Sequence, residues 1–99
     1  MEKTDEKAAR LFYSAVLRLR TEDECRAFFD DVCTKKELQD LVQRFQVAVL
    51  LDQGKNYLEI SRQTSVSSAT ISRVNRCLVY GDGGYRTVID RMKDGGKDD

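Results

Sequence analysis

The stretch ISRQTSVSSATISRVNR, residues 60–76, decides how this 99-residue chain is interpreted. Two short helices that cross steeply need a small side chain where their backbones approach and apolar side chains in the angle between them. The stretch supplies both at that spacing, with a small residue and four apolar ones: Ser61, Ile60, Val66, Ile71 and Val74. The pattern predicts a helix-turn-helix.

The outward positions of the second helix carry short hydroxyls and guanidinium groups, with no acidic residue among them. This composition suits the phosphates and base edges of DNA. The predicted DNA-contacting residues are Lys55, Ser67, Ser68, Ala69, Thr70, Ser72, Arg73 and Arg76. We expect the three bases to neutralise phosphates and the small side chains to approach base edges.

Two positions depart from the usual motif. The turn residue, commonly glycine, is Ser65, and Thr64 stands where a more apolar residue is usual. A pair of short amphipathic helices with a purely structural use gives the same spacing, so this alternative stays open.

Composition favours a small all-α domain. The chain has no Pro and few strand signals, and its glycines lie at positions that mark helix ends. We expect about six helices in one domain over residues 1–93. The tail DGGKDD, residues 94–99, lacks apolar residues and is predicted to be disordered.

Helical periodicity and capping residues place these helices along the chain. A first helix is expected over about residues 6–20. The later helices begin at or next to Thr21, Thr34, Asn56 and Ser67, and a last one carries residues 85–92. Gly54 is expected to close the long third helix and Gly81 the second motif helix.

The long third helix predicts association. Residues 47–51 are apolar on every side of it, and the first helix also carries an apolar stripe. A helix that is apolar all round is buried, and so short a chain can hardly cover both surfaces. We expect a homodimer, which would present two recognition helices about 34 Å apart, one turn of DNA.

Charge gives mild local support for a nucleic-acid partner. Lys+Arg and Asp+Glu are both 17, so the net charge is zero. Residues 55–76 nevertheless hold Lys55, Arg62, Arg73 and Arg76 against the single acid Glu59. Positive charge therefore gathers around the motif, although four bases also suit an ordinary solvated face.

Other function classes lack the residues they need. There is no His, no glycine-rich phosphate loop and no nucleophile with an evident neighbouring base, which argues against an enzyme. Cys25, Cys33 and Cys77 are too widely spaced for a zinc site, so neither a metal nor a cofactor is expected. Cys25 and Cys77 are interpreted as small core residues.

The charged start MEKTDEKAAR and the lack of a long apolar run predict a cytoplasmic protein without a membrane segment.

With these elements placed, residues 8–92 resemble the Trp repressor superfamily, and more closely its YerC/YecD branch. The most specific part is SATISR, residues 68–73, which is similar to the Ala-Thr-Ile-Thr-Arg run of the repressor's recognition helix. The resemblance implies an intertwined, all-helical homodimer that binds double-stranded DNA in a sequence-specific way and regulates transcription as a repressor.

The resemblance also implies a corepressor site. Thr34, Arg44 and Arg73 match the Thr and the two Arg that hold the amino acid corepressor, and two guanidinium groups suit a carboxylate. Val74 departs from the family, because the repressor has Gly there and the indole ring uses the space. L-Tryptophan is therefore not expected as corepressor, whereas a smaller carboxylate ligand stays open. Without a ligand, a helix N-cap explains Thr34, and an intersubunit or surface ion pair explains Arg44.

The leading hypothesis is a dimeric DNA-binding regulator that does not depend on tryptophan. The alternative is a helix-turn-helix module that binds another protein and has no operator of its own. Zero net charge and a small polar recognition face favour that alternative somewhat.

Overall fold

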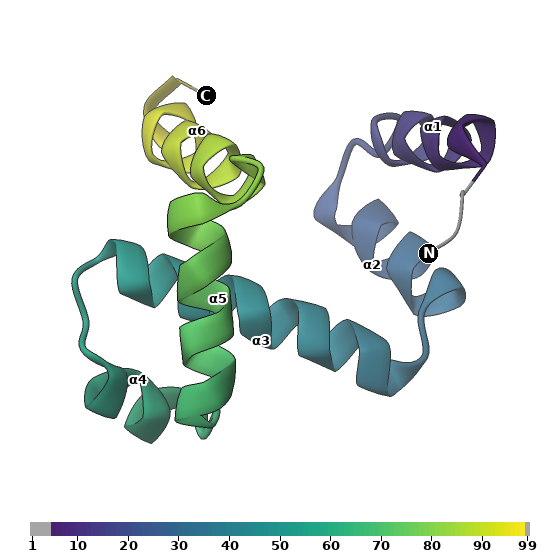
Figure 1. The fold of residues 1–99 in the computed structure, drawn as a ribbon. Helices are drawn as coiled ribbons and strands as arrows, with labels where there is room; N and C mark the ends of the chain where they lie inside the picture. The colour runs from purple at the N-terminus through teal and green to yellow at the C-terminus, as the bar shows by residue number, and fades with distance from the viewer. Residues whose placement is uncertain (1–4, 99) are drawn as a thin grey trace. The chain divides into compact units, whose positions relative to one another are not determined.

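The computed structural model describes residues 5–98, which form six α-helices and no strand (Figure 1). The helices are α1 (Glu6–Val16), α2 (Glu22–Val32), α3 (Lys35–Asp52), α4 (Tyr57–Thr64), α5 (Ser68–Tyr80) and α6 (Gly84–Asp98). The predicted all-α fold class is confirmed. None of the described helices combines the length and the apolar composition that a membrane span requires.

The chain divides into two compact units, residues 1–38 and residues 39–99, here called the N-terminal unit and the C-terminal unit. The extent of the domain, predicted as residues 1–93, stays a prediction. Asp99 and the side chains of residues 96–98 lie outside the described part of the structure. The disorder expected for residues 94–99 likewise stays a prediction.

Aromatic side chains join α1 to α2 in the N-terminal unit. The rings of Phe12 and Phe28 stack with their centroids 5.9 Å apart, and Phe28 meets Phe29 edge to face at 5.3 Å. Neither helix contains a buried residue. Leu11 and Leu17 are 73% and 84% exposed. The unit therefore presents most of its apolar surface outward.

The first helix is shorter than predicted. α1 ends at Val16, whereas the periodicity predicts a helix to about residue 20. The next two backbone hydrogen bonds span three residues instead of four. The Arg18 amide donates to the Ala15 carbonyl, and the Leu19 amide donates to the Val16 carbonyl. The chain is fully extended by Thr21, the cap of α2, where φ is −131°.

Capping side chains start three of the helices where the sequence predicts. The hydroxyl of Thr34 accepts from the Glu37 amide at 3.1 Å, and the Glu37 carboxylate accepts from the Thr34 amide at 2.9 Å. Asn56 and Glu59 form the same reciprocal pair before α4. Thr21 caps α2, but the Glu24 carboxylate there accepts from the Arg20 amide.

The core lies entirely in the C-terminal unit. The buried residues of the described chain are Val47, Ala48, Leu50, Ile60, Val66, Ile71, Val74 and Ile89. The remaining apolar residues of the 47–51 run, Val49 and Leu51, are half-buried against this cluster. The predicted burial of the run is therefore confirmed for Val47, Ala48 and Leu50, but not for Val49 and Leu51 in the single chain.

α5 is the central helix of the C-terminal unit. It packs against α4 and against α6, as the green helix in Figure 1 shows. The two helices beside it therefore fix its orientation in that unit. Cys77 on α5 and Cys25 on α2 are exposed, so their interpretation as core residues is wrong for the single chain.

Candidate nucleic-acid interface

The turn between α4 and α5 is built from the two residues that depart from the usual motif. Ser65 takes the left-handed conformation, with φ 64° and ψ 17°, that glycine commonly supplies. The Thr64 hydroxyl donates to the Ile60 carbonyl at 2.7 Å and accepts from the Val66 amide at 3.1 Å. Thr64 therefore holds the turn through hydrogen bonds where the usual motif relies on apolar packing.

The inner face of α5 anchors it in the core. Ile71 and Val74 are 0% and 3% exposed, and they belong to the same cluster as Ile60 of α4 and Val66 of the turn. Ser61 is half-buried on α4. These residues are the ones that the motif assigns to the angle between the helices.

The outer face of α5 carries the predicted DNA-contacting residues. Ser67, Ser68, Ala69, Ser72, Arg73 and Arg76 are exposed, as is Lys55 before α4. Thr70 is half-buried. The structure therefore brings the set together on and beside the recognition helix, and DNA contact by these residues stays a prediction.

Ser67 caps the N-terminus of the recognition helix, α5. Its hydroxyl oxygen accepts from the Thr70 amide at 3.2 Å and also bonds the Thr70 hydroxyl at 3.2 Å. This bond orients both hydroxyls before any ligand arrives.

The bases around the motif have no acidic partner. Lys55, Arg62, Arg73 and Arg76 form no ion pair with any described residue of the chain. All four are exposed. An unpaired guanidinium group keeps all its donors for an external acceptor, and phosphate oxygens are well suited to it.

The residues predicted for a small ligand are distributed over both units. Thr34 lies in the N-terminal unit, where it caps α3, whereas Arg44 and Arg73 lie in the C-terminal unit. Thr34 is therefore the N-cap of α3, as predicted for this residue in the absence of a ligand. Arg44 is exposed and has no ion pair among the described residues, so an ion pair within the chain does not explain it.

Arg44 lies near an apolar pocket of about 540 Å³ in the C-terminal unit. The pocket is lined by Phe45, Cys77, Gly81, Asp82, Gly84, Tyr85 and Val88. The rings of Phe45 and Tyr85 stack there at 6.3 Å. Burial raises the pKa of the Tyr85 hydroxyl, the Cys77 thiol adds to the rise, and the Arg44 guanidinium opposes it. The pocket could not be predicted from the sequence, because the helical spacing of Tyr85 and Val88 indicates packing only.

These observations define an all-α helix-turn-helix protein with a basic, solvent-facing recognition helix. The chain belongs to the Trp repressor family, since residues 7–93 match the family described as Trp repressor protein. It is 43% identical over 94 residues to the uncharacterized protein YerC of Bacillus subtilis, an alignment that covers 95% of this chain and 90% of that protein.

Solved structures agree with this assignment. A crystal structure of a TrpR like protein from Eubacterium eligens matches with a TM-score of 0.85 and 46% identity, covering 92% of each chain. A crystal structure of a candidate Trp repressor from Staphylococcus aureus matches with a TM-score of 0.87 and 43% identity, covering 93% of this chain and 92% of that one. The predicted family resemblance is confirmed.

Proposed function

We propose that this chain is a homodimeric, sequence-specific DNA-binding regulator that represses transcription. The outer face of α5 carries the proposal, because Arg73 and Arg76 stand there exposed and unpaired among short side chains. Guanidinium groups suit phosphates, and small hydroxyl and methyl groups fit close to base edges. Membership of the Trp repressor family, a family of DNA-binding regulators and not of enzymes, supports the same function.

A homodimer is the proposed assembly. None of the described residues of the N-terminal unit is buried, and Leu11, Tyr13 and Leu17 are each more than 60% exposed. A large exposed apolar surface on a small chain marks an interaction site. Sedimentation should give about twice the chain mass of 11.3 kDa, and a monomer at micromolar concentration would contradict the assembly.

DNA binding is proposed to be independent of tryptophan. Val74 is 3% exposed and is part of the core cluster, so its side chain fills the position that glycine leaves open in the repressor. The recognition helix is thus held by packing without an effector. In Val74→Gly the space reopens, and DNA binding should become dependent on tryptophan.

The test is selection from a pool of random duplex DNA at about 100 mM salt, in parallel with and without L-tryptophan. Enrichment of the same palindrome in both arms is the expected result. Enrichment only with tryptophan would overturn the independence from tryptophan. No enrichment in either arm would overturn DNA recognition.

The phosphate role of Arg73 is tested on the selected duplex. Each phosphate neutralised contributes about −0.9 to the slope of log K against log salt, so Arg73→Ala should weaken binding and flatten the slope by about that amount. Arg26→Ala is the matched control, because it removes an equal, exposed charge from α2. Equal slopes in the two variants would contradict the assignment.

Two alternatives have an observation in their favour. The net charge of zero favours a module that binds another protein; capture of such a partner without DNA, after a failed selection, would support it. The exposed Arg44 guanidinium, which has no ion pair among the described residues, favours a regulator that senses a small carboxylate. For that function, Arg44→Ala should abolish the effect of the carboxylate on DNA affinity.

A further inference from the structure

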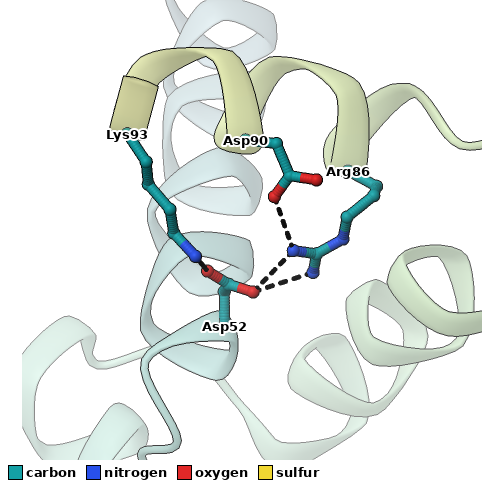
Figure 2. A network of polar contacts seen from close by, with 4 residues as sticks. All are labelled: Asp52, Arg86, Asp90 and Lys93. Carbon is teal, nitrogen blue, oxygen red and sulfur yellow. Dashed lines mark hydrogen bonds and ion pairs between the residues drawn. The ribbon is translucent and has the colours of Figure 1, made fainter. Parts of the chain in front are cut away.

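A network of charged side chains joins α3 to α6 (Figure 2). Asp52, the last residue of α3, accepts on its Oδ1 from Nη1 and Nη2 of Arg86, each at 2.8 Å. Its Oδ2 lies 2.8 Å from Nζ of Lys93. Asp90 adds a bond to Arg86 at 3.1 Å within α6. One carboxylate thus holds two bases that are seven positions apart on the same helix.

The carboxylate of Asp52 is committed to this network. Its side chain is 10% exposed, whereas those of Arg86 and Lys93 are 42% and 59% exposed. Hydrogen bonds from Lys93 and then from Arg86 hold the pKa of Asp52 below its usual range. Ile89, between the two bases in sequence, is buried in the core. The network therefore lies along the edge of the packed core.

The two ends of the network enclose the helix-turn-helix in sequence. α4 and α5 lie between Asp52 and Arg86, and each connecting segment contains a glycine with positive φ, Gly54 at 87° and Gly83 at 86°. A Cβ added at either glycine would meet no atom within 4 Å. Side-chain packing is therefore sparse at these two glycines, and the charged network adds a restraint between the helices that they connect.

The network links a packed group of helices to α3. α5 packs closely against α4 and against α6. A change in the position of α6 therefore carries the recognition helix with it. Asp52 ties α6, and with it this group, to the end of α3.

We propose that Asp52 is a positioning residue for DNA recognition, acting through Arg86 and Lys93 to fix the orientation of the helix-turn-helix relative to α3. This inference rests on the proposed dimeric DNA-binding function. The distance between two recognition helices sets the half-site spacing of the operator. A fixed orientation selects one spacing, and loss of the network relaxes it while each helix-turn-helix remains folded.

The experiment compares Asp52→Asn with Asp90→Asn. Both variants remove one negative charge from the network, but only Asp52→Asn breaks its charged contacts between α3 and α6, and the apolar contacts of Phe45 with Tyr85 remain. Each protein is selected against duplexes that carry the enriched half-sites with spacers of varied length. We expect the wild type and Asp90→Asn to prefer one spacing. Asp52→Asn should accept several spacings and lose affinity on the order of tenfold at the preferred one, within the range of about 5- to 150-fold typical of coupled sites.

A second measurement does not require DNA. Amide hydrogen exchange in residues 53–56 and 81–83, the two connections, should be several-fold faster in Asp52→Asn than in Asp90→Asn, because these segments open locally once the restraint is lost. Melting curves identify the temperature at which both variants are folded. A purely stabilising role would lower the melting temperature and leave the spacing preference unchanged.

The outcomes separate this inference from the proposed function. The same spacing preference and the same exchange rates in the two variants would overturn the role of Asp52. Absence of any enriched DNA with the wild type would overturn the proposed function. In that case, the amide hydrogen exchange rates of the two connections would by themselves test whether Asp52 restrains the helix-turn-helix.

Discussion

The two units of this chain differ in where their apolar side chains end up. The C-terminal unit contains every buried residue of the described chain, and four helices, α3 to α6, contribute to the cluster around Ile60, Ile71 and Val74. The N-terminal unit is also helical, but none of its described residues, 5–38, is buried. Amphipathic helices alone therefore do not make a core, which also needs a facing apolar surface.

The largest expected effect is on the C-terminal unit. Ile71 is fully buried, so Ile71→Ala should lower the free energy of unfolding by about 2–5 kcal/mol, the usual loss of transfer energy plus the cost of a cavity. Urea denaturation at two protein concentrations measures it. Val79 on the same helix is more exposed, so Val79→Ala is the control. A similar loss of stability in Val79→Ala would show that burial does not explain the effect of Ile71→Ala.

The matching change in the N-terminal unit acts on association. Leu11 is 73% exposed in the single chain, so a charge there costs nothing unless a second chain covers it. We expect Leu11→Asp to raise the dimer dissociation constant at least tenfold, about 1.4 kcal/mol, measured by sedimentation. Ser14→Asp adds the same charge one turn further along α1 and should have a smaller effect. An unchanged dimer in Leu11→Asp would show that this face stays in solvent.

The pH dependence of stability should depend on Asp52. Bonds from Lys93 and Arg86 lower the pKa of this carboxyl in the folded state, against about 3.9 in an unfolded chain. Its contribution is therefore present above about pH 4 and is lost as the pH falls through the lower folded pKa. Asp52→Asn should flatten the loss of stability between pH 5 and pH 3, approximate limits of this window. Urea midpoints across that range, with Asp90→Asn as control, measure it.

The smallest expected effect concerns the turn of the helix-turn-helix. Ser65 has a φ of 64°, which glycine adopts without steric cost. Ser65→Gly should change stability by less than about 1 kcal/mol, and in the stabilising direction, because relief of strain exceeds the added entropy of the unfolded chain. Ser68→Gly, in the first turn of α5, should destabilise by about 0.5–1 kcal/mol. Denaturant midpoints measure the stability of both variants. Destabilisation by Ser65→Gly would show that the positive φ of Ser65 does not strain the backbone.

Local chemistry made much of the fold predictable from the sequence. Capping residues such as Thr34 and Asn56 act on amides three positions away, so their signals need no tertiary information. The buried face of the recognition helix was predictable for the same reason, because Ile71 and Val74 follow helical spacing. The end of α1 was not predictable, since the helical pattern continues to Leu19 while the backbone turns earlier.

Contacts between distant residues were outside the reach of sequence patterns. Asp52 and Arg86 are 34 positions apart, and nothing in the spacing of either indicates the other. The hydrogen bonds of the Thr64 hydroxyl were not predictable from the motif, because the motif favours an apolar side chain at this position and says nothing about a hydroxyl group. The exposed bases of the candidate site were predictable in position, but their lack of partners required the structure.

The absence of buried side chains in the N-terminal unit has a consequence during synthesis. Residues 5–38 leave the ribosome before the segment that contains Ile60 and Ile71, yet they contain no packed core that could hold them folded. The later half of each chain can fold as soon as α6 is complete. In the proposed homodimer, the earlier half would reach its final packing only when a second chain arrives, so its folding would follow that of the later half.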